Sequence, residues 1–250
     1  MKKKATLAGT ITGILMFFVL WELAALLVDL PILPSPLEVV PLFCRNMTGI
    51  LGLHFLASSA RVLAAVLLAT ILAAPLGLAL GQMPRLDRLV SPLIAIIYPI
   101  PKIIFLPVIY VLMGISDFSK ILLIAIIIFF QILVVVRDEA AGLRRELILS
   151  VQSLGAGRRA LFRYVYLPAS IPAVLTALRV SVGTAVAVLF IAEQSLTSFG
   201  LGYYIVIETY QVLMYPEMYT GILGMAVMGV LLYFGIYSIE LKVSKHQFIE

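Results

Sequence analysis

The stretch RDEAAGLRRELILSVQSLGAGRRALFRYVYLP, residues 137–168, lies between two long apolar segments of the chain. It contains six of the eighteen Lys and Arg residues, although 62% of the 250 residues are hydrophobic. Its apolar residues follow helix-like spacings that are interrupted at Gly155 and Gly157. The pattern predicts two short amphipathic helices joined by a glycine turn. Such a segment either docks on a soluble partner or lies on lipid headgroups with its basic side chains toward anionic lipid.

Long apolar runs fill most of the remaining sequence. The mean hydropathy is +1.12 and only 12% of residues are charged, which is far from the composition of a soluble domain. About 20 residues cross a hydrocarbon layer of roughly 30 Å, and a segment in lipid must satisfy its own backbone groups, so helices are expected. We therefore predict an all-α polytopic membrane protein, with residues 1–250 as a single transmembrane domain. The six predicted spans are residues 10–29, 57–81, 90–113, 119–136, 169–192 and 219–239.

Basic residues predict the orientation of these spans. With the N-terminus inside, the inner segments hold thirteen Lys and Arg residues, whereas the outer loops hold Arg45 and Lys120, with Arg61 at the outer edge of the second span. The positive-inside rule then places both termini and residues 137–167 in the cytoplasm. The thirteen inner residues are Lys2, Lys3, Lys4, Arg85, Arg88, Lys242, Lys245 and the six of the quoted stretch.

The chain shows no sequence signature of catalysis or of a metal site. Cys44 is the only cysteine, and His54 and His246 are too far apart in sequence to suggest a shared metal ion. Neither a phosphate-binding G-x-x-x-x-G-K-[ST] motif nor an H-E-x-x-H motif occurs. We expect no enzyme activity, no metal and no cofactor in this chain. The net charge of +5 indicates topology and contact with membrane lipid rather than nucleic-acid binding.

The quoted stretch also carries a resemblance to a known family. The frame G-x9-[IV]-x-L-P, here Gly155, Val165, Leu167 and Pro168, resembles the cytoplasmic EAA loop of permease subunits of ABC importers. Further stretches in the same order are similar to the nitrate, sulfonate and taurine branch of these permeases. They are LPSPLEVV (33–40), HFLASSARVLAA (54–65), YPIPKIIFLPVIYVLMGISDFSKILL (98–123), LPASIPAVLTALRVSVGTAVAVLFIAE (167–193) and FGLG (199–202).

The resemblance implies the type I importer permease fold and places the family's Glu-Ala-Ala triplet on Leu149, Ser150 and Val151. The letters EAA at residues 139–141 are then a coincidence, because the glycine due six residues later would fall on Arg145. Leu149 departs from the family, which typically has a glutamate there, so no salt bridge is carried over to this position.

The implied partners follow from the same resemblance. A coupling helix would dock on an ATPase subunit, and the economical assembly is a homodimer of this chain with two ATPase subunits, which hold ATP and Mg. An extracytoplasmic solute-binding protein would deliver the solute. The residues expected to couple to the ATPase are Leu149, Ser150, Val151, Gly155, Arg158, Arg159, Val165, Leu167 and Pro168.

Among the ionisable residues inside or at the end of predicted spans, Lys102, Arg179 and Glu193 are the candidates for the translocation path. A cation in lipid is costly, so each should be paired or functional. In one interpretation Lys102 neutralises a helix end, and Arg179 pairs with Glu193 or with a carbonyl. In the other, one or both cations line the translocation path and attract an anion. Glu193 would then be a gate or a structural partner rather than a ligand of an anionic solute. The prolines at 99, 101 and 107 should break the third span.

The implied function is that of a permease subunit in the bacterial-type inner membrane, which forms the path for a small nitrate-, sulfonate- or taurine-like anion. A permease for a pyrimidine vitamin precursor is the alternative within the family. An ion-coupled secondary carrier would require acidic residues at mid-membrane and usually an inverted repeat, whereas the buried charges here are mostly basic. An intramembrane enzyme would require a converging nucleophile and base, which the sequence does not offer.

Overall fold

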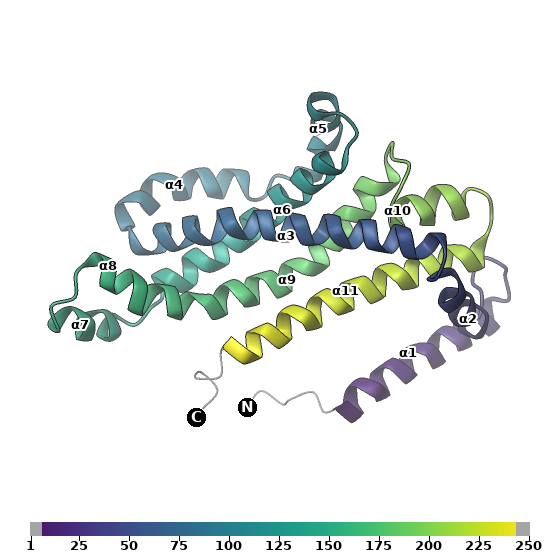
Figure 1. Cartoon of the computed structure of the whole chain (residues 1–250), viewed down its shortest axis with the longest axis horizontal. Coiled ribbons are helices and arrows are strands. Elements are labelled where there is room, and N and C mark those ends of the chain that lie inside the picture. Colours follow the sequence, from purple (N-terminus) through teal and green to yellow (C-terminus); the bar gives the residue numbers. More distant parts are fainter. Residues whose placement is uncertain (1–6, 244–250) are drawn as a thin grey trace. The chain divides into compact units, whose positions relative to one another are not determined.

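The computed structural model describes residues 7–243, and every regular element within this range is helical (Figure 1). The prediction of an all-α protein is confirmed. The elements are α1 (Leu7–Val28), α2 (Pro36–Asn46), α3 (Ile50–Gln82), α4 (Pro84–Ile97), η1 (Lys102–Phe105), α5 (Leu106–Met113), α6 (Asp117–Ala141), α7 (Arg145–Ser153), α8 (Arg158–Leu161), η2 (Phe162–Tyr166), α9 (Leu167–Gln194), α10 (Leu201–Tyr203), η3 (Tyr204–Tyr210) and α11 (Tyr215–Val243).

The chain forms two compact units. Unit 1 comprises residues 1–57 and 193–226, and unit 2 comprises residues 58–192 and 227–250. Helices α3, α9 and α11 each contribute residues to both units. The prediction of a single transmembrane domain stays a prediction, and each unit is described by itself below.

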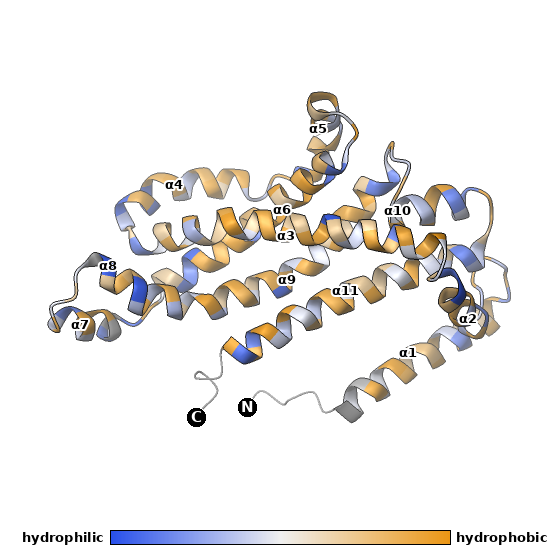
Figure 2. Cartoon of the chain, in the orientation of Figure 1, coloured by the Kyte–Doolittle hydropathy of each residue, from blue (hydrophilic) through white to orange (hydrophobic). Residues whose placement is uncertain are grey.

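Five helices are long and apolar enough to cross a membrane, namely α1, α3, α6, α9 and α11. They carry the hydrophobic colour along their length in Figure 2. A sixth candidate is the pair formed by residues 84–97 and 102–113. The count of about six spans is therefore confirmed when this bent pair is taken as one.

The third span differs from the continuous segment predicted at residues 90–113. Helix α4 begins earlier, at Pro84, and ends at Ile97, and the second half begins only at Lys102. The two halves are bent by 78°. Pro99 and Pro101 lie in the break, where their missing N–H groups cannot continue a helical ladder. The predicted break is thus confirmed, and the predicted start is wrong.

In unit 1, short-range polar contacts hold the start of α2 in place. The Ser35 hydroxyl accepts from the Leu37 N–H at 3.1 Å and donates to Glu22 at 2.5 Å, so it caps α2 and joins it to α1. The indole N–H of Trp21 donates to the Pro34 carbonyl at 3.1 Å, and its ring stacks on Tyr219 of α11. These contacts hold α1, α2 and the start of α11 together.

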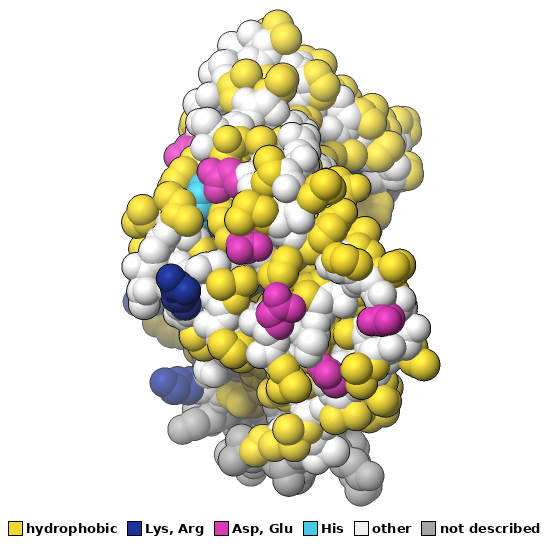
Figure 3. Space-filling view, turned by 90° about the vertical axis from the view of Figure 1, so that its right-hand side faces the viewer, with side chains coloured by type: hydrophobic (Ala, Val, Ile, Leu, Met, Phe, Trp, Pro, Cys, Tyr) yellow, Lys and Arg dark blue, Asp and Glu magenta, His cyan; other side chains and the backbone are white. Residues whose placement is uncertain are grey.

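Apolar side chains remain exposed along the spanning helices. Leu27 is 85% exposed and Leu67 is 61% exposed. The space-filling view in Figure 3 shows apolar side chains over much of one face. Such a surface is stable only against lipid or another apolar surface, as expected for a membrane protein.

Unit 2 is built around a close contact between α3 and α6. A Cβ atom added at Gly81 would lie 2.6 Å from the Cβ of Ala140 and 2.6 Å from the carbonyl oxygen of Arg137. One turn earlier, at Gly77, it would lie 2.9 Å from the Leu133 carbonyl oxygen. Because helices in lipid associate through close van der Waals packing, glycine at these positions lets the two backbones approach.

We predict that Gly81→Val lowers the free energy of unfolding by about 1–3 kcal/mol, because the contacting Arg137 carbonyl belongs to a helix backbone that cannot move cheaply. The control is Gly183→Ala in α9, where an added Cβ meets nothing within 4 Å. That change should stabilise by up to about 1 kcal/mol. Thermal unfolding of both purified variants in detergent measures the difference, and equal midpoints would contradict the role of Gly81.

Candidate functional site

The quoted stretch folds as two short helices joined by a turn, as predicted. Helix α7 ends at Ser153, and Gly155 has a φ of +81°, a left-handed conformation that glycine adopts at little cost. Its N–H donates to the Gln152 carbonyl at 2.9 Å, which closes the turn. Helix α8 follows and leads through the π-helical segment η2 into α9 without a break. Movement of this element would therefore be passed directly to a membrane-spanning helix.

The two candidate triplets lie in different surroundings. The letters EAA at residues 139–141 end helix α6, where Ala140 is 3% exposed and packs near Gly81. Leu149, Ser150 and Val151 lie instead on α7, ahead of the Gly155 turn, and Leu149 is 52% exposed. The position that the resemblance assigns to the family's glutamate is thus an exposed apolar one.

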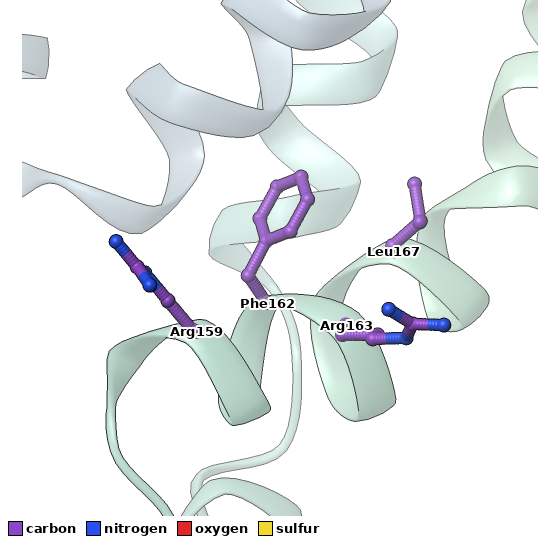
Figure 4. Close-up of a pocket in the computed structure, with 4 residues that line it drawn as sticks. All are labelled: Arg159, Phe162, Arg163 and Leu167. Atoms are coloured by element: carbon purple, nitrogen blue, oxygen red, sulfur yellow. The ribbon is translucent and has the colours of Figure 1, made fainter.

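A surface pocket of about 610 Å³ lies on the segment from α8 to the start of α9. It is lined by Arg159, Phe162, Arg163 and Leu167. In Figure 4 the Phe162 ring projects from the helix, and the guanidinium groups of Arg159 and Arg163 lie on either side of it. The pocket thus has an apolar surface between two guanidinium groups. Such a surface could bind an apolar side chain of another protein that has carboxylates on either side of it.

The same segment also contains buried apolar residues. Val165 is 8% exposed and Leu161 is 7% exposed, so both anchor the short helices. Leu167 and Pro168 open α9 directly after η2, and the Leu167 N–H donates to the Phe162 carbonyl of that segment. The side chain of Arg158 lies outside what the structure describes, so its predicted role is not tested.

Lys102 neutralises a helix end, as one of the two interpretations expected. Its Nζ donates to the carbonyls of Ile97, Tyr98 and Ile100 at 3.1, 3.0 and 3.2 Å. An ammonium group has three N–H donors, so all three are used here. The same nitrogen lies 4.6 Å from the centre of the Phe130 ring. With three carbonyls bound, no N–H of Lys102 remains for a solute.

Arg179 has a carboxylate partner. Its Nε lies 2.9 Å from Oε2 of Glu240, and another guanidinium nitrogen donates to the Tyr233 hydroxyl at 2.9 Å. The rings of Tyr233 and Tyr237 each lie 5.5 Å from the guanidinium carbon. Thr176 donates to the other oxygen of Glu240 at 2.8 Å. The charge of Arg179 is thus balanced by a group on α11, and the two helices are linked.

The predicted pairing of Arg179 with Glu193 is wrong, since the partner is Glu240. Glu193 is fully buried in unit 1, where one of its carboxylate oxygens accepts from the Gly202 N–H at 3.0 Å. The Gly200 N–H donates to His54 Nδ1 at 2.9 Å in the same turn. Glu193 therefore orders the FGLG turn, because a charged acceptor holds a backbone N–H strongly. Its role as a gate stays a prediction.

The comparisons with known proteins identify the family. A model of the binding-protein-dependent transport system inner membrane component matches residues 65–245. The chain belongs to this family. It is therefore the permease component of an ABC importer rather than an enzyme, and it works with a solute-binding protein and an ATPase. The ion-coupled carrier considered above is set aside.

Two curated relatives of the permease are informative. The chain is 29% identical to the taurine transport system permease protein TauC of Escherichia coli, over 98% of this chain and 90% of TauC. It is 30% identical to the formylaminopyrimidine transport permease protein ThiX of Halalkalibacterium halodurans, over 76% of each chain.

A chain of the MetNI methionine ABC transporter in an inward-facing conformation superposes with a TM-score of 0.68 at 21% identity, covering 79% of this chain and 98% of that one. This likeness supports the type I permease fold.

Sequence reasoning missed an ion cluster in the permease, in which two buried cations share the exposed carboxylate of Asp117. Arg61 is 5% exposed and its guanidinium lies 2.7 Å from Asp117, at the start of α6. Lys120 lies 3.6 Å from the same carboxylate and is 4% exposed. Lys120 was assigned to an outer loop, which is wrong because it lies one turn inside α6. Its distance of three residues from Asp117 could have indicated a helical pair.

A second missed feature is the amide of Gln131, which stands within the apolar run of α6. Its Nε2 donates to Thr184 Oγ1 on α9 at 3.2 Å. A lone amide in a membrane span could have been singled out from the sequence, because polar groups in lipid are costly unless bonded. Among residues 7–243, no group of three or more His, Cys, Asp or Glu side chains is arranged to hold a metal ion.

Proposed function

We propose that the permease forms the translocation path for a small organic anion of the sulfonate class. The observation that carries this proposal is the charge of Lys102, which is bonded to carbonyl groups and to no carboxylate within residues 7–243. A cation at a broken span in low dielectric attracts anions over several ångströms. The taurine permease TauC, which matches 98% of the chain, supports the same class of solute.

A pyrimidine vitamin precursor remains the second candidate solute, because the name of the relative ThiX specifies formylaminopyrimidine. The two candidates differ in their dependence on charge. A sulfonate is an anion at neutral pH, whereas a neutral pyrimidine would gain little from the Lys102 ammonium.

The ATPase would dock on α7, the Gly155 turn and α8. Exposed apolar side chains there include Leu154, which is 86% exposed, and Phe162, which is 44% exposed. They suit a groove on a soluble partner, and Arg159 would meet acidic residues at its rim. Two ATPase subunits with ATP and Mg, a second copy of the permease and a solute-binding protein complete the proposed complex. The contributing residues are Leu149, Ser150, Val151, Gly155, Arg158, Arg159, Val165, Leu167 and Pro168.

The permease would have both termini and the α7–α8 element in the cytoplasm, because thirteen basic residues then lie inside. We predict that a cysteine at Ser153 reacts only with a reagent applied from the cytoplasm, and one at Ser198 only from outside. Cys44 is exposed and must first be changed to Ser. Labelling of both from one side would contradict the crossing by α9.

Substrate-stimulated ATP hydrolysis in the reconstituted complex tests the function, and Gly155→Val tests the coupling. Valine at a φ of +81° costs about 1–2 kcal/mol of backbone strain, which corresponds to roughly a tenfold loss of transport. Membrane insertion should be unchanged. Gly157→Val is the control, since Gly157 does not have a positive φ and an added Cβ there meets nothing within 4 Å. Normal transport by Gly155→Val would contradict the docking proposal.

Neutralising Lys102 should reduce anion transport. We expect Lys102→Gln to lower uptake of a sulfonate about tenfold, the equivalent of roughly 1.4 kcal/mol, while Lys102→Arg retains most of it. Complex assembly, followed by size-exclusion chromatography, should persist in both variants.

The control for charge is the double variant Arg179→Gln with Glu240→Gln. It removes two opposite charges, so the net charge is unchanged, and it keeps hydrogen-bonding groups at both positions. Its sulfonate uptake should stay near that of the wild type. If Lys102→Gln transports sulfonate normally, the anion proposal is wrong. If it loses uptake of a neutral pyrimidine to the same extent, Lys102 acts through the helix break alone.

A further inference from the structure

The C-terminal end of α6 carries an arginine that reaches a neighbouring helix. Arg137 lies one turn before α6 ends at Ala141, and the chain then passes into α7 at Arg145. The α7–α8 element is therefore joined to α6 on one side and, through η2, to α9 on the other. A displacement of this element acts on two spanning helices, and the contacts of Arg137 determine what moves with α6.

The side chain of Arg137 binds α4. Its Nη1 donates to the Ser91 hydroxyl at 3.2 Å, and its Nε lies 3.6 Å from Oδ1 of Asp87. The Ser91 hydroxyl donates to the same Asp87 oxygen at 2.8 Å, so the three side chains form a closed network. Because a planar guanidinium directs its N–H groups in fixed directions, this network restrains α4 against α6 more closely than a single point charge would.

The main chain of Arg137 is also part of a tight contact. A Cβ added at Gly81 would lie 2.6 Å from the Arg137 carbonyl oxygen, so α3 lies directly against α6 at this residue. Met83 alone separates the end of α3 from the start of α4. One residue of α6 thus meets α3 through its backbone and α4 through its side chain.

Helix α4 has few other attachments. Its Leu89 and Ile96 side chains are 77% and 68% exposed, whereas Ile94 is buried. Within the described range 7–243, Arg137 is the only residue outside the broken span whose side chain forms a hydrogen bond or an ion pair with α4. Helix α4 would therefore be free to lag behind α6 if the Arg137 contacts were absent.

The position of this network suits transmission of movement better than stabilisation of the fold. Arg137 and Asp87 are 24% and 33% exposed, and partly exposed ion pairs contribute little to stability. At the other end of α4, Tyr98 lines a cavity of about 220 Å³ together with Val180 of α9. One wall of this cavity is thus connected to the α7–α8 element through α6 and Arg137, and another directly through η2 and α9.

We propose that Arg137 is a positioning residue that makes α4 follow the α7–α8 element, so that the docked ATPase moves the broken span. The inference rests on the proposed function, which places the ATPase on that element. Helix α9 receives the displacement directly, whereas α4 receives it through the Arg137 contacts with Asp87 and Ser91. The two walls of the cavity then move by separable routes.

The test measures cysteine labelling in the complete complex in detergent, with and without a non-hydrolysable ATP analogue and Mg. Each permease carries Cys44→Ser and one new cysteine, either Tyr98→Cys or Val180→Cys, at positions that are 47% and 70% exposed. With Arg137 present, the nucleotide should change both labelling rates about tenfold, within the usual range of coupling between sites. In Arg137→Gln the change should persist at Val180→Cys and disappear at Tyr98→Cys.

Three further variants separate the link to α4 from other effects of the charge. Asp138→Asn is the matched control, because Asp138 also pairs with Arg137, at 3.0 Å, but lies on α6 itself. Its response should equal that of the wild type at both cysteines. Asp87→Asn should reproduce Arg137→Gln, and the exchange of Arg137→Asp with Asp87→Arg should restore the response at Tyr98→Cys. If Arg137→Gln does not assemble, these variants carry the test.

The outcomes distinguish the inference from the proposed function. A normal response at Tyr98→Cys in Arg137→Gln or in Asp87→Asn overturns the role of Arg137 and leaves the ATPase docking standing. Loss of the response at both cysteines, or an equal loss in Asp138→Asn, also overturns it, because Arg137 would then act on docking or on local charge. If neither cysteine responds to the nucleotide with Arg137 present, the proposed docking is wrong and the inference falls with it.

Discussion

The third span depends on one constraint of the lipid environment, which is that every backbone carbonyl needs a donor. Pro99 and Pro101 remove the N–H groups that would continue α4, and carbonyls at the end of that helix are left without helical partners. The Lys102 ammonium supplies three donors to this region from a single side chain. The 78° bend in the span is possible because the released carbonyls are satisfied within the protein. The same arrangement leaves the Lys102 ammonium without a carboxylate partner among residues 7–243.

The helices of unit 2 are connected by polar pairs placed within apolar surfaces. Gln131 joins α6 to α9, and the cluster of Arg179, Glu240 and Tyr233 joins α9 to α11. Apolar side chains provide little specificity against lipid tails, which are equally apolar, so these pairs define which helix faces meet. Because α9 takes part in both connections and continues directly from the α7–α8 element, a displacement of that element would move a linked group of helices. In the proposed complex, this linkage would couple the soluble ATPase to the spans.

Composition and run length were sufficient to predict the helical class and the approximate number of spans, because the bilayer thickness determines how long an apolar helix must be. The glycine turn at Gly155 was also predictable, since its spacing within an amphipathic pattern indicates a break. Partner choice was not predictable. Arg179 pairs with Glu240, which lies sixty-one positions away in the sequence, and only the packing of α9 on α11 brings them together. The use of all three Lys102 donors likewise depends on the geometry of the break.

The close contact between α3 and α6 has a consequence for how such chains are recognised. Gly81 needs a small neighbour, and Ala140 provides one in the middle of the letters Glu-Ala-Ala. A small residue is thus required at Ala140 by a buried helix crossing, whereas the triplet position that the resemblance implies, residues 149–151, lies on α7 in the proposed docking surface. A motif search by letters alone would assign an interaction surface to a triplet whose middle residue, Ala140, is buried in a helix contact, although Glu139 and Ala141 are exposed. Ala140 is buried and Leu149 is exposed, so a short motif in a membrane protein gains its meaning from the helix face on which each of its residues lies.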